Sequence, residues 1–157
     1  MPEDHKWAER AFDRQDELQS EMMRASIADA KEATRAAFFL NGAACIAILG
    51  FLSSLMSGDT QDSAEPILSA ARFGLLWFAG GALFAAITSG LAYLCNSLYA
   101  RAAGAMERSF EHPFIRETPE ATRDQNWARR LNVLAVVTFA LSHMAFGVGL
   151  FIVARAI

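Results

Sequence analysis

Three asparagine side chains lie inside otherwise apolar stretches of the sequence. Asn41 is near the start of the first stretch, Asn96 near the end of the second, and Asn132 at the start of the third. Hydrocarbon offers an amide no hydrogen bond, so each must find a partner on another helix or reach the interface. At about 1.5 Å per residue the three share one depth. We interpret them as interhelical hydrogen-bonding groups, with a polar vestibule or ligand site as the alternative.

His143 lies deeper, at the level where the second stretch has Thr88 and Ser89. An ionisable side chain at this depth is a functional hypothesis, because charge is costly in a bilayer. A neutral imidazole bonded to a hydroxyl of the neighbouring helix explains it without function. No Asp, Glu, Lys or Arg accompanies it, so a proton relay would require a partner chain.

Motifs for catalysis and cofactor binding are missing from the sequence. It has no phosphate-binding glycine loop, no HExxH and no pair of carboxylates within an apolar stretch. Cys45 and Cys95 have no CxxC or His/Cys cluster around them and are expected to be inert packing residues. Asp59, Asp62 and Glu65 lack calcium-loop spacing. We therefore expect no catalytic residue, metal site or cofactor, and a protein that is not an enzyme.

Three stretches without Asp, Glu, Lys or Arg must position these side chains: 37–56, 73–100 and 131–154. Each is at least 20 residues long, which suffices for a helix to cross a hydrocarbon core of about 30 Å. The 157 residues, 54% of them hydrophobic, are therefore predicted to form an all-α integral membrane protein. In this prediction the three-span bundle occupies 37–157.

The distribution of Lys and Arg predicts the orientation of the three spans. Six occur in 1–36, one in 57–72, six in 101–130 and one in 155–157. The positive-inside bias then places the N-terminus and 101–130 in the cytoplasm, with 57–72 and the C-terminus outside. The acidic first segment lacks the features of a signal peptide, so we expect the first span to remain as an anchor.

Residues 1–36 are predicted to form a cytoplasmic amphipathic helix, because residues 3–36 contain no Gly or Pro. No such breaker occurs before Gly42 either, and the sequence leaves open whether the helix continues into the first span. A thin apolar stripe consists of Trp7, Ala11, Phe12, Leu18, Met22, Met23, Ala25 and Ile27. The stripe fits a helix resting on 101–130 or on the membrane surface, or else a coiled-coil or partner-docking surface. Nine acidic residues against six basic ones disfavour binding to nucleic acid or anionic lipid by charge alone.

Small residues recur every four positions on the second span. One ridge consists of Gly81, Ala85 and Ser89, and an adjoining one of Ala82, Ala86 and Gly90. Such small-xxx-small ridges let helix backbones approach closely, so we expect both to be packing faces. Two ridges favour self-association or docking onto another membrane subunit, although a central helix between two neighbours explains the same pattern. In the loop before the third span, Thr118 followed by Pro119 predicts a helix N-terminus.

The segments "LNGAACIAILGFL" (40–52) and "GLAYLCNSLY" (90–99), together with the glycine-containing third span, resemble a loose group of small bacterial inner-membrane proteins. The first span of that group opens with a Leu-Asn-Gly-small-small pattern. The resemblance implies a bacterial inner membrane and transfers no activity or catalytic residue.

The function predicted from the sequence is a non-enzymatic accessory or scaffold subunit that acts through lateral helix packing and docking of its N-terminal helix. The alternative is a homo-oligomeric pore or small transporter with His143 at mid-membrane. The expected partners are the lipid bilayer and either another membrane protein or a second copy of the chain, and not nucleic acid.

Overall fold

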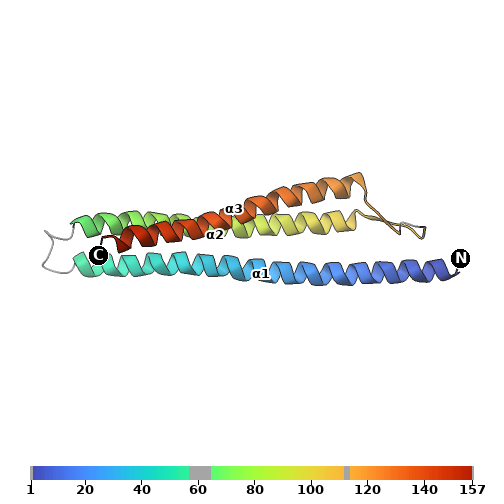
Figure 1. Cartoon of the computed structure of the whole chain (residues 1–157), viewed down its shortest axis with the longest axis horizontal. Coiled ribbons are helices and arrows are strands. Elements are labelled where there is room, and N and C mark those ends of the chain that lie inside the picture. The colour runs from blue at the N-terminus through green and yellow to red at the C-terminus, as the bar shows by residue number, and fades with distance from the viewer. Residues whose placement is uncertain (1, 57–64, 112–113, 157) are drawn as a thin grey trace. The chain divides into compact units, whose positions relative to one another are not determined.

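The computed structural model describes residues 2–56, 65–111 and 114–156, and these are almost entirely helical (Figure 1). The elements are α1 (Pro2–Met56), α2 (Glu65–Gly104), β1 (Glu107–Arg108), β2 (Ile115–Arg116) and α3 (Pro119–Ala154). The predicted all-α class is confirmed, and each helix contains a stretch long and apolar enough to cross a membrane.

The helix boundaries partly differ from the predicted ones. α1 is one unbroken helix of 55 residues, so the N-terminal helix continues into the first apolar stretch, a point that the sequence leaves open. Residues 65–70, predicted to belong to a loop, are the first turns of α2. Pro66 suits that position, because the first turn has no use for its missing N–H. Asp59 and Asp62, also assigned to that loop, lie outside the described residues.

A short β-hairpin joins α2 to α3. Glu107 pairs with Arg116 and Arg108 with Ile115, and the Ser109 amide donates to the Phe114 carbonyl at 2.8 Å. The sequence predicts only a loop here, because a strand of two residues is too short to show the alternation of apolar and polar residues that indicates a strand.

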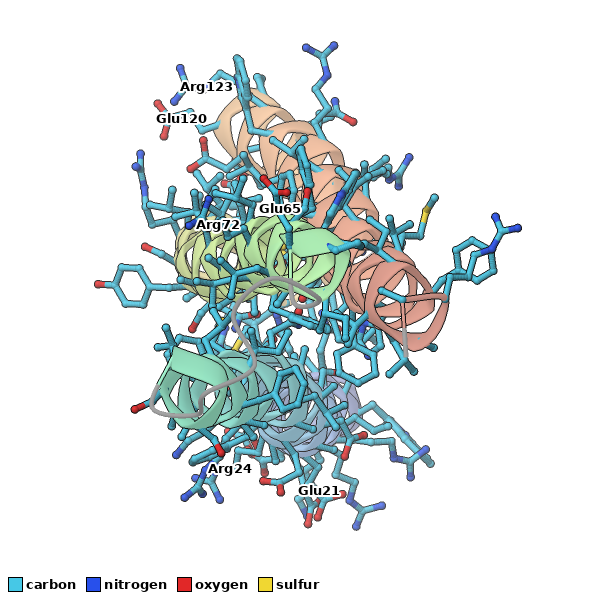
Figure 2. The ribbon with its side chains drawn as sticks, turned by 90° about the vertical axis from the view of Figure 1, so that its left-hand side faces the viewer. Glu21, Arg24, Glu65, Arg72, Glu120 and Arg123 are labelled. Carbon is cyan, nitrogen blue, oxygen red and sulfur yellow. The ribbon has the colours of Figure 1, made fainter. Side chains whose placement is uncertain are left out.

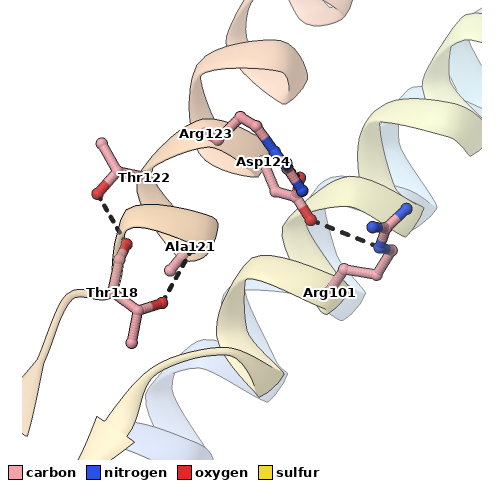
Figure 3. A network of polar contacts seen from close by, with 6 residues as sticks. All are labelled: Arg101, Thr118, Ala121, Thr122, Arg123 and Asp124. Atoms are coloured by element: carbon pink, nitrogen blue, oxygen red, sulfur yellow. Dashed lines mark hydrogen bonds and ion pairs between the residues drawn. The ribbon is translucent and has the colours of Figure 1, made fainter.

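The predicted N-terminus of α3 is confirmed (Figure 3). Thr118 Oγ1 accepts from the Ala121 amide at 3.1 Å, which is the N-cap bond expected of this residue type. The same hydroxyl donates to the Ala105 carbonyl at 2.8 Å. Thr118 therefore both starts α3 and ties it to the end of α2.

The chain forms two compact units, each with parts of all three helices. The first contains Met1–Lys31 and Gly90–Leu134, and the second contains Glu32–Ser89 and Ala135–Ile157. The end of α2 and the start of α3 therefore group with the N-terminal part of α1.

In the second unit α2 and α3 pack through buried small residues at every seventh position. These are Gly74, Gly81 and Thr88 on α2 and Ala135, Ser142 and Gly149 on α3. A Cβ added at Gly74 would lie 3.6 Å from the Gly149 carbonyl oxygen, and the Phe78 ring fills the space beside Gly149. Phe78 also joins Ile48 of α1 in the hydrophobic core. The seven-residue period is that of an antiparallel coiled coil.

The same period continues in the first unit. Cys95 and Ala102 on α2, and Ala121 and Ala128 on α3, are all buried. The Cys95 thiol donates to the Ala128 carbonyl at 3.3 Å, so this cysteine packs against backbone, as a small core residue does. Cys45, in the other unit, is also a free thiol and packs beside the hydrophobic core.

The N-terminal part of α1 contacts the hairpin region of its own chain. Ala8 and Phe12 are buried, the Phe12 and Phe110 rings meet edge to face with centroids 6.2 Å apart, and Arg108 forms an ion pair with Asp16 at 2.8 Å. Glu21 and Arg24 point outward from α1 (Figure 2). These contacts favour a helix that rests on 101–130, one of the two uses predicted for its apolar stripe.

Replacing Thr118 with Ala removes both the N-cap bond and the bond to Ala105. We expect the free energy of unfolding to fall by about 1–2 kcal/mol, measured by thermal unfolding followed by circular dichroism in detergent. Thr122→Ala, one turn later, is the control, because the exposed Thr122 hydroxyl only donates to the Thr118 carbonyl of its own helix. Equal losses in the two variants would contradict the assigned role of Thr118.

Candidate polar site at the helix interface

Asn41 lies at the junction of the three helices in the second unit. Its side-chain amide donates to Ser142 Oγ of α3 at 3.3 Å and to the Ala37 carbonyl of its own helix at 2.9 Å. Ser142 Oγ in turn donates to the Gly81 carbonyl of α2 at 2.8 Å. Asn41 and Ser142 are the largest fully buried side chains described. One chain of hydrogen bonds therefore connects α1, α3 and α2.

The side-chain oxygen of Asn41 explains why residue 81 is glycine. Asn41 Oδ1 is buried and has no hydrogen-bond donor among the described residues, and a Cβ added at Gly81 would overlap this oxygen. The Gly81 α-hydrogen points at the oxygen instead, in the manner of the weak Cα–H···O contacts seen between closely packed helices. Gly81 thus supplies both a carbonyl acceptor and the space for the amide.

A second interhelical bond lies nearby in the same unit. The Thr88 and Thr138 hydroxyls are 2.8 Å apart, and each also lies near a carbonyl of its own helix, Thr88 near Phe84 and Thr138 near Ala135. Since a hydroxyl has one hydrogen, one of the two donates across to the other helix and the other donates to its own carbonyl. Thr88 is 6% exposed and Thr138 8%. The predicted partner of Thr88 was His143, and the structure gives it Thr138.

His143 faces outward from α3. Its Nδ1 lies 3.0 Å from the Phe139 carbonyl oxygen of the same helix, and its ring packs on the Phe139 ring with centroids 4.4 Å apart. Ser89 of α2 is also exposed. The structure therefore does not bring His143, Thr88 and Ser89 together: one is buried between helices and two lie on outer surfaces.

The three predicted amides also separate into two groups. Asn41 is buried in the second unit, whereas Asn96 and Asn132 line a cavity in the first unit whose α1 wall ends at Ala30. Asn96 is half-buried and Asn132 exposed. The structure thus brings Asn96 and Asn132 to one cavity, and it pairs Asn41 with Ser142.

The two predicted small-residue ridges of α2 have different environments. Gly81 and Ala85 are buried against the other helices, but Ser89 at the end of that ridge is exposed. In the adjoining ridge Ala82 is half-buried, and Ala86 and Gly90 are exposed. Contacts within the chain therefore occupy most of the first ridge and leave most of the second one open.

Comparisons of the chain with protein families, with curated protein sequences and with solved structures found no match. The site is therefore interpreted from its own geometry.

Two residues of the site, Ser142 and Thr138, were not predicted. A single serine or threonine in an apolar helix does not stand out, because its hydroxyl can bond its own helix. A signal was present in the seven-residue spacing of small residues on α3, namely Ala121, Ala128, Ala135, Ser142 and Gly149. This spacing identifies the face of α3 that meets α2.

The buried polar groups join helices to one another. Asn41, Ser142, Thr88 and Thr138 direct their described hydrogen bonds to neighbouring helices or to their own backbone. Interhelical bonds of this kind contribute roughly 0.6–2 kcal/mol each in a membrane. The geometry supports the interpretation of Asn41 as an interhelical hydrogen-bonding group.

Adjacent glycines provide a test of this packing. Gly81→Ala forces a Cβ into the Asn41 amide, and we expect it to lower the free energy of unfolding by about 1–3 kcal/mol. Gly80→Ala, where no atom lies within 4 Å of the added Cβ, should raise it by about 0.5–1 kcal/mol through helix propensity. Thermal unfolding in detergent measures both, and a shift of the same sign in the two variants would exclude the proposed contact.

Proposed function

We propose that this chain is a non-enzymatic accessory or scaffold subunit of a bacterial inner membrane, with its N-terminus in the cytoplasm and its C-terminus outside. It acts by packing laterally against a second copy or another membrane protein. The observation that supports the proposal is a polar, small-residue surface on α3 that the chain's own contacts leave uncovered. In hydrocarbon such a surface gains more from a protein neighbour than from lipid.

This α3 surface consists of Ala140, His143 and Gly147. The three residues lie within two turns on one side of the helix, and all are exposed. A Cβ added at Gly147 would meet no atom within 4 Å, so another helix can approach the backbone there. His143 uses Nδ1 on its own helix, which leaves Nε2 directed toward the surroundings. An imidazole nitrogen facing lipid is costly, and a partner's hydrogen-bonding group would remove that cost.

Exposed small residues on α2 support the same proposal. Ala86 and Ser89 follow each other at three-residue spacing, and both are exposed. They are the part of the two predicted ridges that helix packing inside the chain does not use. Docking of the N-terminal helix onto a partner has less support, because Phe12 and Asp16 already contact the chain's own hairpin region and Ala8 is buried.

The alternative, a pore with His143, Thr88 and Ser89 facing one lumen, has less support. Thr88 is engaged with Thr138 between helices, so it is not available to a lumen formed by the outer surfaces. His143 could line a passage only between copies of the chain. The scaffold proposal needs no such passage.

Gly147→Leu tests lateral packing directly. The added side chain has room within one chain, so we expect normal folding but an association about tenfold or more weaker, from about 1–3 kcal/mol of lost contact. Leu141→Phe is the control, because the exposed Leu141 is one, two and six residues from Ala140, His143 and Gly147 and so lies on a different side of α3. Fluorescence energy transfer between labelled chains in liposomes, with the mass in detergent alongside, measures association.

The proposal predicts that wild type associates with itself or co-purifies with one membrane partner in stoichiometric amount. A monomer in liposomes without such a partner would contradict it. Ion flux through liposomes that is abolished by His143→Ala would instead support the pore.

A further inference from the structure

The first unit contains a cavity of about 1120 Å³ between α1 on one side and α2, the hairpin region and the start of α3 on the other. Its α1 wall extends from Trp7 to Ala30, which is about 35 Å along the helix axis. One leaflet of a bilayer with its headgroups is only about 20–23 Å thick. The cavity is therefore long enough for the head and the chain of a membrane lipid.

The charge in the cavity is opposite to that of the surrounding segment. Residues 1–36 contain nine acidic and six basic side chains, yet none of the described lining side chains is acidic, and Arg10 and Arg14 both line it. Arg10 stacks on the Trp7 ring, 5.5 Å from its centroid. Neither arginine is in an ion pair with a described carboxylate. Two guanidinium groups thus face one cavity that no described carboxylate lines.

The rest of the lining is uncharged and mixes apolar with polar side chains. Leu18 and Met23 of α1 face the cavity along with Tyr99 of α2, and Ala30 and Ala92 line it as well. The polar members are Gln15, Gln19, Ser26, Asn96 and Asn132. The cationic groups lie at the end marked by Trp7, and the remaining wall offers uncharged surface along α1 and α2.

We propose that this cavity, whose α1 wall lies wholly within the cytoplasmic segment 1–36, binds one anionic phospholipid withdrawn from the bilayer, with its phosphate between Arg10 and Arg14 and an acyl chain along Leu18, Met23 and Ala92. Guanidinium groups bind phosphate oxygens through paired, charge-assisted hydrogen bonds. The net acidic charge of the segment disfavours nonspecific attraction to an anionic surface, so the selectivity must come from the position of these two arginines. The inference rests on the proposed membrane location, but it is tested in detergent and can therefore fail separately from lateral packing.

The Leu18→Trp variant provides a probe beside the proposed acyl chain, because Leu18 lines the cavity. With Trp7→Phe, Trp77→Phe and Trp127→Phe as background, the chain has a single tryptophan, at position 18. We expect phosphatidylglycerol with brominated acyl chains, added to the detergent-purified chain, to quench this fluorescence saturably, with one lipid bound per chain by native mass spectrometry. Brominated phosphatidylcholine, which has no net charge, should bind about tenfold or more weakly, because hydrogen bonds to charged groups dominate such recognition.

Two variants of equal charge separate the cavity from the charge of the segment. Arg10→Gln with Arg14→Gln should weaken binding of phosphatidylglycerol about tenfold or more. Arg24→Gln with Lys31→Gln removes the same charge from exposed α1 residues that do not line the cavity, and should leave binding unchanged. Ala92→Phe, which fills the apolar part, should weaken binding while helicity by circular dichroism stays the same.

Three results would overturn the proposal. One is equal quenching by the two lipids, which indicates partition into the micelle. Another is equal loss of binding in both charge variants, which indicates a general surface attraction. The third is displacement of the lipid by millimolar inorganic phosphate, or tighter binding of a brominated free fatty acid, either of which identifies a different ligand.

Discussion

The close approach of α2 and α3 is the constraint on which the other contacts depend. Ser142 reaches the Gly81 carbonyl, and Cys95 the Ala128 carbonyl, because no larger side chain separates the two backbones. Along these bonds the residue numbers rise on α2 and fall on α3, as in an antiparallel pair. The bond from Thr118 to the Ala105 carbonyl follows the same order. A seven-residue repeat of small residues is compatible with the left-handed, shallow crossing of coiled coils. The four-residue ridges expected from the sequence are typical of the opposite hand.

The sequence predicted where the helices lie along the chain better than it predicted which side of each helix is buried. The charge-free stretches and the Thr-Pro-Glu signal at 118–120 are local properties, and they correctly indicated three helices and the start of α3. The absence of breakers before Gly42 is compatible with the unbroken α1 but did not decide it. Which side of a helix a residue occupies depends on its neighbours. Depth along the axis could therefore place Asn41, Asn96 and Asn132 at one level without showing that only Asn41 is enclosed. The hairpin was missed because its strands are two residues long.

α1 contributes differently to the two units. In the second unit Asn41 and Ile48 insert among the other helices, and the core is filled by Phe78 and its neighbours. In the first unit the face of α1 toward the cavity includes Gln15 and Gln19, and these long polar side chains cannot pack as small residues do. Contact there is made by Ala8, Phe12 and Asp16 near the hairpin. The same helix thus serves as a close-packed element in one unit and as the wall of an open space in the other.

The local hydrogen bonds of the polar side chains bear on the order of assembly. Asn41, Thr88, Thr138 and His143 each have a carbonyl oxygen of their own helix, three or four residues earlier, within hydrogen-bonding distance. A single helix therefore satisfies part of the hydrogen-bonding capacity of these side chains before any neighbour is present. Ser142 differs in the assembled unit, since its described acceptor is the Gly81 carbonyl of α2. A slip of α2 along α3 would break this bond, so Ser142 favours the observed register.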